Sequence, residues 1–337
     1  MQELLRRLSR GESLSKEECK NAIESILKME VSPSQVGAFL MGLSLKGETD
    51  EELAGAIEAL RSKALKIEVQ NPEALVDNCG TGGDMSNTFN ISTASAFVLA
   101  GNGVRVAKHG NRSVSSKSGS ADFLKALGAK IELSPESALR LLNEVGITFL
   151  YAPSFHPAMK AVAPIRKELG FRSIFNIAGP LSNPAFVKRQ IVGVYSERLL
   201  PVVAKTLKSL GSIRAFVVFG KEGLDEVSVC GETLYAEVKD GDISFSTFHP
   251  SEIGLKTHDI RALQVNSPEE SVRVVLSALR GENSPSLDAI LVNSAFGFVV
   301  AGLANSILNG FEMAKDSVFS GKAYKKLMEF VELSKQL

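Results

Sequence analysis

The chain has 337 residues, 44% of them hydrophobic and 23% charged. This allows two or three domains, or one large α/β domain with an appendage, with a sizeable buried core. Its 38 Lys and Arg residues balance 38 Asp and Glu residues, and it has no Trp and four Tyr. Zero net charge provides no overall basic field for nucleic acid, and few aromatic rings are available for base stacking.

The cysteine pattern and the hydropathy pattern predict a cytoplasmic protein. The three cysteines are far apart and show no CxxC spacing, which argues against a disulfide framework and against a thiolate zinc site. Residues 1–10 are charged and amphipathic, unlike the apolar core of a signal peptide. The most apolar stretch, residues 289–304, is interrupted by polar residues and is shorter than the ~20 apolar residues of a membrane span. We therefore expect no membrane association.

The first 70 residues contain start signals for three amphipathic helices and no strand pattern. Ser15 followed by Glu18 forms a capping box ahead of apolar residues at helical spacing. A second capping box, Thr49 with Glu52, and an N-cap followed by proline at Ser32 open two more helices. Three short helices cannot enclose a large core. We therefore expect their apolar stripes to dock on another domain or subunit.

From residue 72 onwards, short apolar runs alternate with helical patterns. This alternation predicts a largely parallel sheet covered by helices. The predicted strands are residues 74–77, 104–107, 148–152, 190–195, 215–219 and 233–238. The predicted helices are residues 93–100, 121–127, 135–144, 199–210, 268–280, 287–308 and 323–333. Parallel sheets bind ligands beyond the carboxyl ends of their strands, so loops that follow strands are candidate binding segments.

A glycine-rich loop, Gly-Thr-Gly-Gly-Asp at positions 80–84, follows the first predicted strand. Glycine permits positive φ and close approach of a ligand, and consecutive backbone N–H groups can form an anion-binding concavity. Asn90, Ser92 and Thr93 then open a helix whose N-terminal donors and dipole favour a phosphate group. The spacing matches neither the Walker A loop nor the Rossmann fingerprint. By itself the loop is also compatible with a tight turn and an ordinary N-cap.

A second loop, after the second predicted strand, concentrates cations among small polar residues. Lys108, His109 and Arg112 lie beside Asn111 and a serine-rich run at 113–120. Point-charge and fork-shaped donors next to hydroxyls suit a polyanion. The alternative is a solvated basic loop.

A third segment supplies His156 and Arg166, followed by a turn-rich stretch at 179–184 that is a plausible hinge. Arg166 could bind a carboxylate through two parallel hydrogen bonds. On residue type alone, however, Arg166 is an ordinary surface arginine and His156 a structural histidine.

A fourth segment carries the adjacent carboxylates Asp225 and Glu226 after a strand and glycines. Magnesium binds through a few carboxylates together with substrate phosphates, so a small acidic pair is sufficient. An isolated pair of this kind is usually a solvated surface.

In this order, the segments resemble the signatures of the anthranilate phosphoribosyltransferase family. The resemblance is carried by GTGGD, TFNIST, KHGNRSVSSKSGSAD, FHPAMK, LGFRSIFNIAGPLSNPA and GLDEVS, between residues 77 and 228, and the helical start and the tail also fit. It implies transfer of the phosphoribosyl group of phosphoribosyl pyrophosphate (PRPP) to the amine of anthranilate, with release of pyrophosphate, in tryptophan biosynthesis.

The resemblance also implies the architecture of class II pyrimidine nucleoside phosphorylases. It implies a small all-helical N-terminal domain, residues 1–70 joined by helices from about 164–185. The large α/β domain, residues 71–337, would hold a mostly parallel central sheet covered by helices, with the cleft between the two domains. It further implies a homodimer formed through the helical domain.

The family's residue roles are carried over by motif. The implied donor-binding residues are Gly80, Gly82, Gly83, Asp84, Thr88, Asn90, Ser92, Thr93, Lys108, Ser116 and Ser120. The implied anthranilate-binding residues are Gly80, His109, Asn111, His156, Arg166 and Pro180. Two magnesium ions per subunit are implied at Ser92, Asp225 and Glu226. No general acid or base is assigned, because an aromatic amine attacks as a neutral nucleophile and the demanding task is stabilising the pyrophosphate.

Two departures and two alternatives remain. Cys79 stands where the family commonly has an aliphatic residue, so it is not evidence for a thiol nucleophile; Met85 stands where a smaller residue is frequent. A pyrimidine nucleoside phosphorylase would share the glycine loop and the Lys-His-Gly segment but would not need the acidic pair. A non-catalytic paralogue that binds nucleic acid is disfavoured by the zero net charge.

Overall fold

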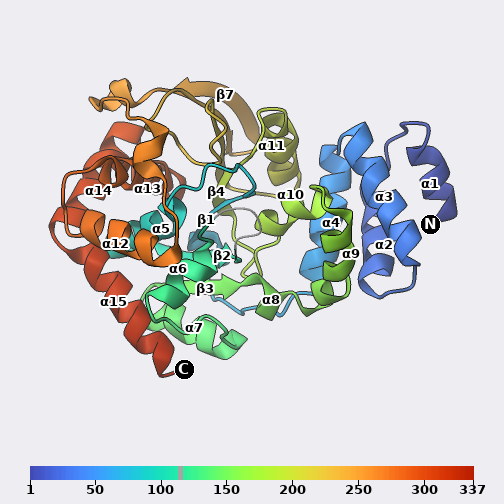
Figure 1. The fold of residues 1–337 in the computed structure, drawn as a ribbon, viewed down its shortest axis with the longest axis horizontal. Helices are drawn as coiled ribbons and strands as arrows, with labels where there is room; N and C mark the ends of the chain where they lie inside the picture. The colour runs from blue at the N-terminus through green and yellow to red at the C-terminus, as the bar shows by residue number, and fades with distance from the viewer. Residues whose placement is uncertain (113–116) are drawn as a thin grey trace.

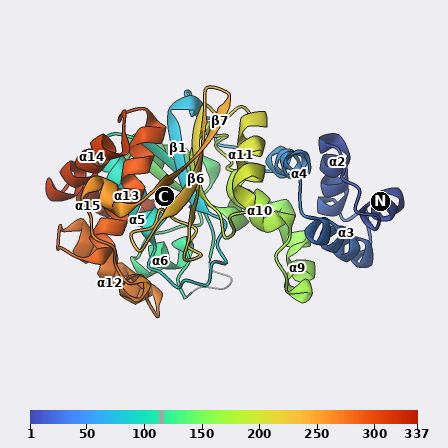
Figure 2. The same ribbon diagram turned by 90° about the horizontal axis from the view of Figure 1, so that it is seen from above.

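The structure is a computed structural model and describes residues 1–112 and 117–337. A helical N-terminal region, blue in Figure 1, lies beside a larger part built on one sheet. Figure 2 shows from above that α9 and α10 lie on the same side as the N-terminal helices. No helix in these two ranges is long and apolar enough to cross a membrane.

Four helices form the N-terminal region: α1 (Gln2–Leu8), α2 (Lys16–Leu27), α3 (Pro33–Lys46) and α4 (Asp50–Ser62). The three predicted start signals are confirmed. The side chains of Ser15, Ser32 and Thr49 each accept a hydrogen bond from the backbone N–H of the third helical residue. The sequence interpretation missed α1, which has no side-chain N-cap hydrogen bond.

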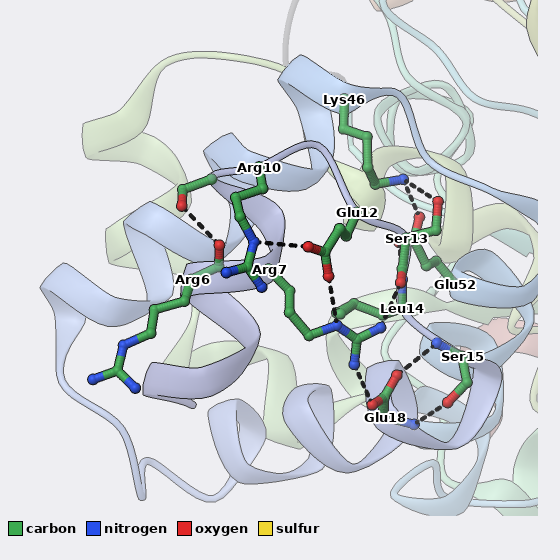
Figure 3. A network of polar contacts seen from close by, with 11 residues as sticks. Arg6, Arg7, Arg10, Glu12, Ser13, Leu14, Ser15, Glu18, Lys46 and Glu52 are labelled. Carbon is green, nitrogen blue, oxygen red and sulfur yellow. Dashed lines mark hydrogen bonds and ion pairs between the residues drawn. The ribbon is translucent and has the colours of Figure 1, made fainter.

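A buried ion pair joins α3 to α4 (Figure 3). Glu52 is 0% exposed and pairs with Nζ of Lys46 at 2.9 Å. Its two carboxylate oxygens also accept the backbone N–H groups of Leu14 and Thr49, each at 2.8 Å. A buried carboxylate is tolerated when it is paired and hydrogen-bonded in this way, so Glu52 fixes the entry to α4 as well as the packing of α3.

One sheet of seven strands organises the larger part, in the order β3-β2-β1-β4-β5-β6-β7. The strands are β1 (Leu75–Gly80), β2 (Arg105–Gly110), β3 (Ile147–Tyr151), β4 (Arg189–Gly193), β5 (Arg214–Gly220), β6 (Thr233–Lys239) and β7 (Asp242–Phe248). The first five are parallel, and β6 and β7 are antiparallel. The mostly parallel sheet and all six predicted strands are confirmed. β7 was missed, although an Asp240-Gly241 turn with positive φ at both residues precedes it and is typical of a hairpin.

Helices follow most of the strands. They are α5 (Ile91–Gly101), α6 (Ser120–Ala126), α7 (Pro135–Glu144), α8 (Ala152–Phe155), α9 (Ala163–Leu169), α10 (Ile174–Leu181), α11 (Leu199–Ser209), α12 (Pro268–Leu279), α13 (Pro285–Ala301), α14 (Ile307–Phe319) and α15 (Lys322–Lys335). The single helical segment expected at 287–308 is wrong. Gly302, in the left-handed region at φ 80°, ends α13, and α14 begins five residues later.

Two hydrophobic cores lie on the two faces of the sheet. Along β5, Phe216 and Val218 belong to the core that contains α5 and α13, whereas Val217 belongs to the core on the other face. That second core contains residues of α10 and α11 and extends without a break into α2, α3 and α4. The N-terminal helices are therefore attached to the sheet through α10 and α11.

Candidate active site

Three of the predicted motifs meet at the carboxyl edge of the parallel strands. β1 leads into the glycine loop, β2 ends with the Lys-His-Gly segment, and β5 leads into the acidic pair. The N–H of Thr81 donates to the carbonyl of Gly193 at 2.9 Å, and the N–H of Tyr195 donates to Oγ1 of Thr81 at 3.1 Å. These two hydrogen bonds attach the glycine loop to the end of β4.

Asp225 lies directly against the glycine loop. Its Oδ2 accepts the backbone N–H of Gly82 at 2.7 Å. A Cβ atom at Gly80 would lie 2.3 Å from the same oxygen, and a Cβ at Gly193 would lie 1.6 Å from the backbone oxygen of Asp225. Two strand-end glycines are therefore required for the acidic loop to approach. Gly82 and Gly83 are needed for a different reason, since they have φ of 65° and 76°.

Glu226 is held by the first turn of α5. The N–H of Ser92 donates to Oε1 of Glu226 at 3.1 Å. Burial raises the pKa of Glu226 to about 7, with Lys108 and Ser92 opposing the shift. Burial, followed by repulsion from Asp84 and Glu226, raises the pKa of Asp225 well above its usual value. Carboxylates crowded in this way favour the binding of a cation.

Lys108 lies beneath the loop rather than in solvent. It is 3% exposed and donates to the carbonyl of Asn78. Burial lowers its pKa, opposed chiefly by the attraction of Asp77 and also by the acidic pair. Asp77 is 0% exposed and accepts hydrogen bonds from the His109 N–H at 3.1 Å and from Asn183 at 2.8 Å. Asp77, Asn78 and Asn183 were not assigned a role from the sequence, because only the pairing of β1 with β2 and β4 brings them together.

Asn90 connects the start of α5 to two other segments. Its amide nitrogen donates to the carbonyl of Ser118 at 3.2 Å, and its Oδ1 accepts the hydroxyl of Ser271 on α12 at 2.8 Å. Thr93 is 1% exposed and lines a small internal space with Phe97. The Thr93 hydroxyl is buried without a hydrogen-bond partner among the described residues, so its contact with the donor stays a prediction.

The loop after Asp84 is held by a segment that the sequence did not single out. Asp84 accepts the N–H of Ser86 at 3.3 Å and its hydroxyl at 2.5 Å. Thr88 forms an isolated antiparallel bridge with Gln264, and the N–H of Phe89 donates to the carbonyl of Leu263 at 2.9 Å. Residues 263–265 thus support the predicted donor loop, although nothing in their residue types indicates this.

The second loop is closed by Asn111 and Ser120. The carbonyl of Asn111 accepts the hydroxyl of Ser120 and the N–H of Ala121, each at 3.1 Å. The predicted donor-binding residue Ser116 lies outside the described residues.

His109 and His156, two of the predicted acceptor-binding residues, lie side by side. Their ring centroids are 5.1 Å apart, and within the described part of the chain the Nε2 atom of each is buried without a hydrogen-bond partner. Burial lowers the pKa of His109 well below its usual value and that of His156 to about 4. The backbones of Gly179 and Ser182, on either side of the predicted residue Pro180, lie against His109 and His156 respectively. The carbonyl of Pro180 itself accepts a hydrogen bond from Sγ of Cys79 at 3.5 Å. The turn expected at 179–184 is wrong for its first three residues, which are helical in α10.

Arg166 lies on α9 and faces α10. Its guanidinium is 5.6 Å from the ring centroid of Phe175 and 3.5 Å from Oδ1 of Asn176. Burial lowers its pKa. Of the side chains that the structure describes, Asn176 is the one that hydrogen-bonds to Arg166, so Arg166 is not bonded to the other predicted acceptor residues.

Arg172 contacts the glycine loop and was missed as a site residue. It donates to the carbonyl of Gly83 and lies over the ring of Tyr195, with 4.4 Å between Cζ and the ring centroid. Its own carbonyl accepts the hydroxyl of Ser44 on α3 at 3.4 Å. The sequence around Arg172 carried no signal for these contacts, because the partners come from three distant segments.

The acidic pair fits magnesium held partly by a substrate. In residues 1–112 and 117–337, no group of three or more His, Cys, Asp or Glu side chains could hold a metal ion. Magnesium keeps several waters and binds through one or two carboxylates plus substrate phosphates. Asp225 and Glu226 match that donor set, and the repulsion that they share with Asp84 is what a cation would relieve.

Comparisons with known proteins cover nearly the whole chain. Residues 2–64 match the glycosyl transferase family helical bundle domain, and residues 72–324 match the glycosyl transferase family a/b domain. The anthranilate phosphoribosyltransferase of Aquifex aeolicus is 53% identical over 100% of this chain and 99% of its own length.

Solved structures are similar over the same extent. The enzyme from Thermus thermophilus superimposes with a TM-score of 0.93 at 39% identity, covering 98% of this chain and 99% of that one. The Saccharomyces cerevisiae enzyme in complex with PRPP and Mg gives a TM-score of 0.89 at 31% identity, covering 99% and 98%. With both domains matched, and with relatives of one name aligned from end to end, the chain belongs to the anthranilate phosphoribosyltransferase family.

Proposed function

We propose that this chain transfers the phosphoribosyl group of PRPP to the amine of anthranilate, giving N-(5-phosphoribosyl)anthranilate and pyrophosphate for tryptophan biosynthesis. The observation that carries the proposal is the attachment of the acidic loop to the glycine loop and to α5, through Gly82 N–H to Asp225 and Ser92 N–H to Glu226. Solved relatives contain PRPP and Mg in one case and 4-fluoroanthranilate in another.

The donor is assigned to the loop between β1 and α5 and to the loop after β2. Backbone N–H groups of the glycine loop and of the α5 N-terminus suit phosphate oxygens. Asp225 and Glu226, with the Ser92 hydroxyl, would hold two magnesium ions per subunit. The chemistry that magnesium supplies when bound is neutralisation of charge on the leaving pyrophosphate. The full set of proposed donor-binding residues is the one carried over by motif above.

The acceptor is assigned to the wall formed by His109, His156 and Pro180, with Arg166 for the carboxylate of anthranilate. Both histidines are held neutral by burial, which suits contact with an aromatic ring. The contact of Arg166 with Asn176, at 3.5 Å, is weak enough to be exchanged for a carboxylate.

The reaction needs positioning more than proton transfer. The amine nitrogen forms a bond to C1 of the ribose as the bond from C1 to the pyrophosphate oxygen breaks, and the nitrogen then loses a proton to solvent. The chain contributes the fixed donors around the pyrophosphate and the orientation of the two substrates. No described side chain is required as a general base.

We also propose that residues 1–70, with the helices of about 164–185, form a helical domain, that residues 71–337 form the donor-binding domain, and that the cleft lies between them. A homodimer through the helical domain is supported by apolar side chains exposed on α3, since Met41 is 40% and Leu45 is 80% exposed. A cytoplasmic location is supported by three free cysteines. Light scattering of the purified protein, alone and as Leu45→Lys, tests the dimer.

The reaction is tested with purified protein, PRPP, magnesium and anthranilate, by following the loss of anthranilate fluorescence. We expect turnover that requires both PRPP and magnesium. No turnover of anthranilate, together with phosphorolysis of thymidine or uridine, would replace the proposal by the nucleoside phosphorylase alternative.

A further inference from the structure

Arg172 occupies a position where three parts of the fold meet. It lies in the chain between α9 and α10, two helices that Figure 2 shows on the side of the N-terminal helices. Its guanidinium reaches the carbonyl of Gly83 in the glycine loop, and its backbone carbonyl is bound by the hydroxyl of Ser44 on α3. Arg172 therefore contacts both α3 of the N-terminal region and the proposed donor-binding glycine loop.

The guanidinium is oriented by an aromatic ring. Cζ of Arg172 is 4.4 Å from the ring centroid of Tyr195, which follows β4. The backbone N–H of Tyr195 donates to the side chain of Thr81 in the same glycine loop. The glycine loop is thus bound at two positions, at Thr81 by the backbone of Tyr195 and at Gly83 by the side chain of Arg172.

The contact constrains a segment that is otherwise permissive. Gly83 has a φ of 76°, and a Cβ atom there would lie 2.9 Å from Nε of Arg172. A glycine pair has many accessible backbone conformations. A charge-assisted hydrogen bond to one carbonyl selects one of them, in which the adjacent N–H of Gly82 donates to Asp225.

We propose that Arg172 is a positioning residue that holds the glycine loop in the conformation that binds the donor, and that it couples this loop to the position of the helical region. The proposal rests on the proposed function only for its kinetic consequences. The structural consequence, protection of the loop backbone, does not depend on any substrate.

Two sets of variants separate positioning from simple stabilisation. Arg172→Gln removes the charge, whereas Arg172→Lys keeps a charge and a donor. Tyr195→Leu removes the ring, whereas Tyr195→Phe keeps it. Lys167→Gln, an exposed cation on α9, is the matched control.

The first readout is hydrogen exchange of the peptide covering residues 80–89 in the full-length protein without substrates. We expect about tenfold faster exchange in Arg172→Gln and Tyr195→Leu, with exchange elsewhere unchanged. Arg172→Lys and Tyr195→Phe should be close to the parent protein. Unchanged exchange in a folded Arg172→Gln protein overturns the proposal, and so does an equal increase throughout the chain.

The second readout is steady-state kinetics. We expect the KM for PRPP to rise about tenfold in Arg172→Gln, with a smaller change in the KM for anthranilate and partial recovery in Arg172→Lys. A fall in kcat of Arg172→Gln while the KM values for PRPP and anthranilate both stay unchanged contradicts the positioning role. If the parent protein shows no transferase activity but Arg172→Gln still accelerates exchange at 80–89, the proposed function fails while the positioning role stands. If Arg172→Gln does not fold, the two Tyr195 variants decide.

Discussion

The backbone N–H of Gly82 donates a hydrogen bond of 2.7 Å to Oδ2 of Asp225, a residue 143 positions later in the chain. Asp225 also passes so close to β1 and β4 that side chains at Gly80 and Gly193 are excluded. The glycine loop and the acidic pair are therefore one structural unit. A substitution in the glycine loop or in the acidic pair should therefore alter both the binding of PRPP and the dependence of the rate on magnesium.

Gly193→Ala tests the excluded volume. The new Cβ would lie 1.6 Å from the backbone oxygen of Asp225, so the acidic loop has to move by more than 1 Å. Because misplacement of about 1 Å can cost about 10²-fold in rate, we expect a fall in kcat/KM of roughly that size. Gly231→Ala is the control, since its Cβ would meet Glu222 at 3.9 Å. If Gly193→Ala kept the kcat/KM of the parent protein, as Gly231→Ala should, the close approach of Asp225 to Gly193 would not be needed for activity.

Replacing both Asp225 and Glu226 by their amides tests the metal assignment. The amides keep the shape and remove two charges, so we expect the magnesium concentration for half-maximal rate to rise by roughly tenfold or more, or turnover to be lost. The measurement is a magnesium titration at saturating PRPP. Glu232→Gln, which removes a carboxylate paired with Lys221 at the surface, is the control. An unchanged titration in the double variant would remove the assignment.

Arg166→Ala should weaken anthranilate much more than PRPP. Loss of a charge-assisted hydrogen bond costs about 1.5–3 kcal/mol, which corresponds to a rise of roughly 10- to 100-fold in the KM for anthranilate. The KM for PRPP should stay near its original value. Lys167→Ala, the next residue on α9, should change neither. Equal losses for both substrates would be incompatible with a specific contact to the acceptor.

The burial of His156 predicts a loss of stability in acid. Its pKa is about 4 in the folded protein and 6.5 when unperturbed, because burial disfavours the charged ring. Folding therefore favours the neutral ring. The stability that depends on the neutral ring is fully present above pH 6.5 and is lost as the pH falls towards 4. The lost contribution is about 3 kcal/mol at most.

The measurement is the free energy of unfolding in urea between pH 7 and pH 4, for the parent protein and for His156→Asn. Asp77, whose pKa is raised to about 6 by burial, contributes with the opposite sign in this range, but equally in both proteins. We expect the free energy of unfolding of His156→Asn to fall less between pH 7 and pH 4 than that of the parent protein. Identical pH dependence would mean that His156 is accessible to protonation in the fold.

Predictions from the sequence were reliable where both residues of an interaction lie within one short segment. The capping boxes at Ser15 and Thr49 were predictable because the cap and its acceptor are three residues apart. The six predicted strands were found because their apolar runs are bounded by turn residues. The missed β7 had a hairpin signal before it. The break of 287–308 also had local signals that were missed, since Gly302 ends α13 and Ser306 is the N-cap of α14.

The sequence by itself determined the alternation of strands and helices, the starts of α2, α3 and α4, and the placement of three of the four motifs after a strand, because these depend on neighbours within a few residues. Only the tertiary structure decided that Gly193 must lack a side chain, that Lys108 is buried beneath the acidic pair and that Arg172 binds Gly83. Those contacts join residues that are far apart in the chain. They exist because parallel pairing brings the carboxyl ends of β1, β2, β4 and β5 to one edge.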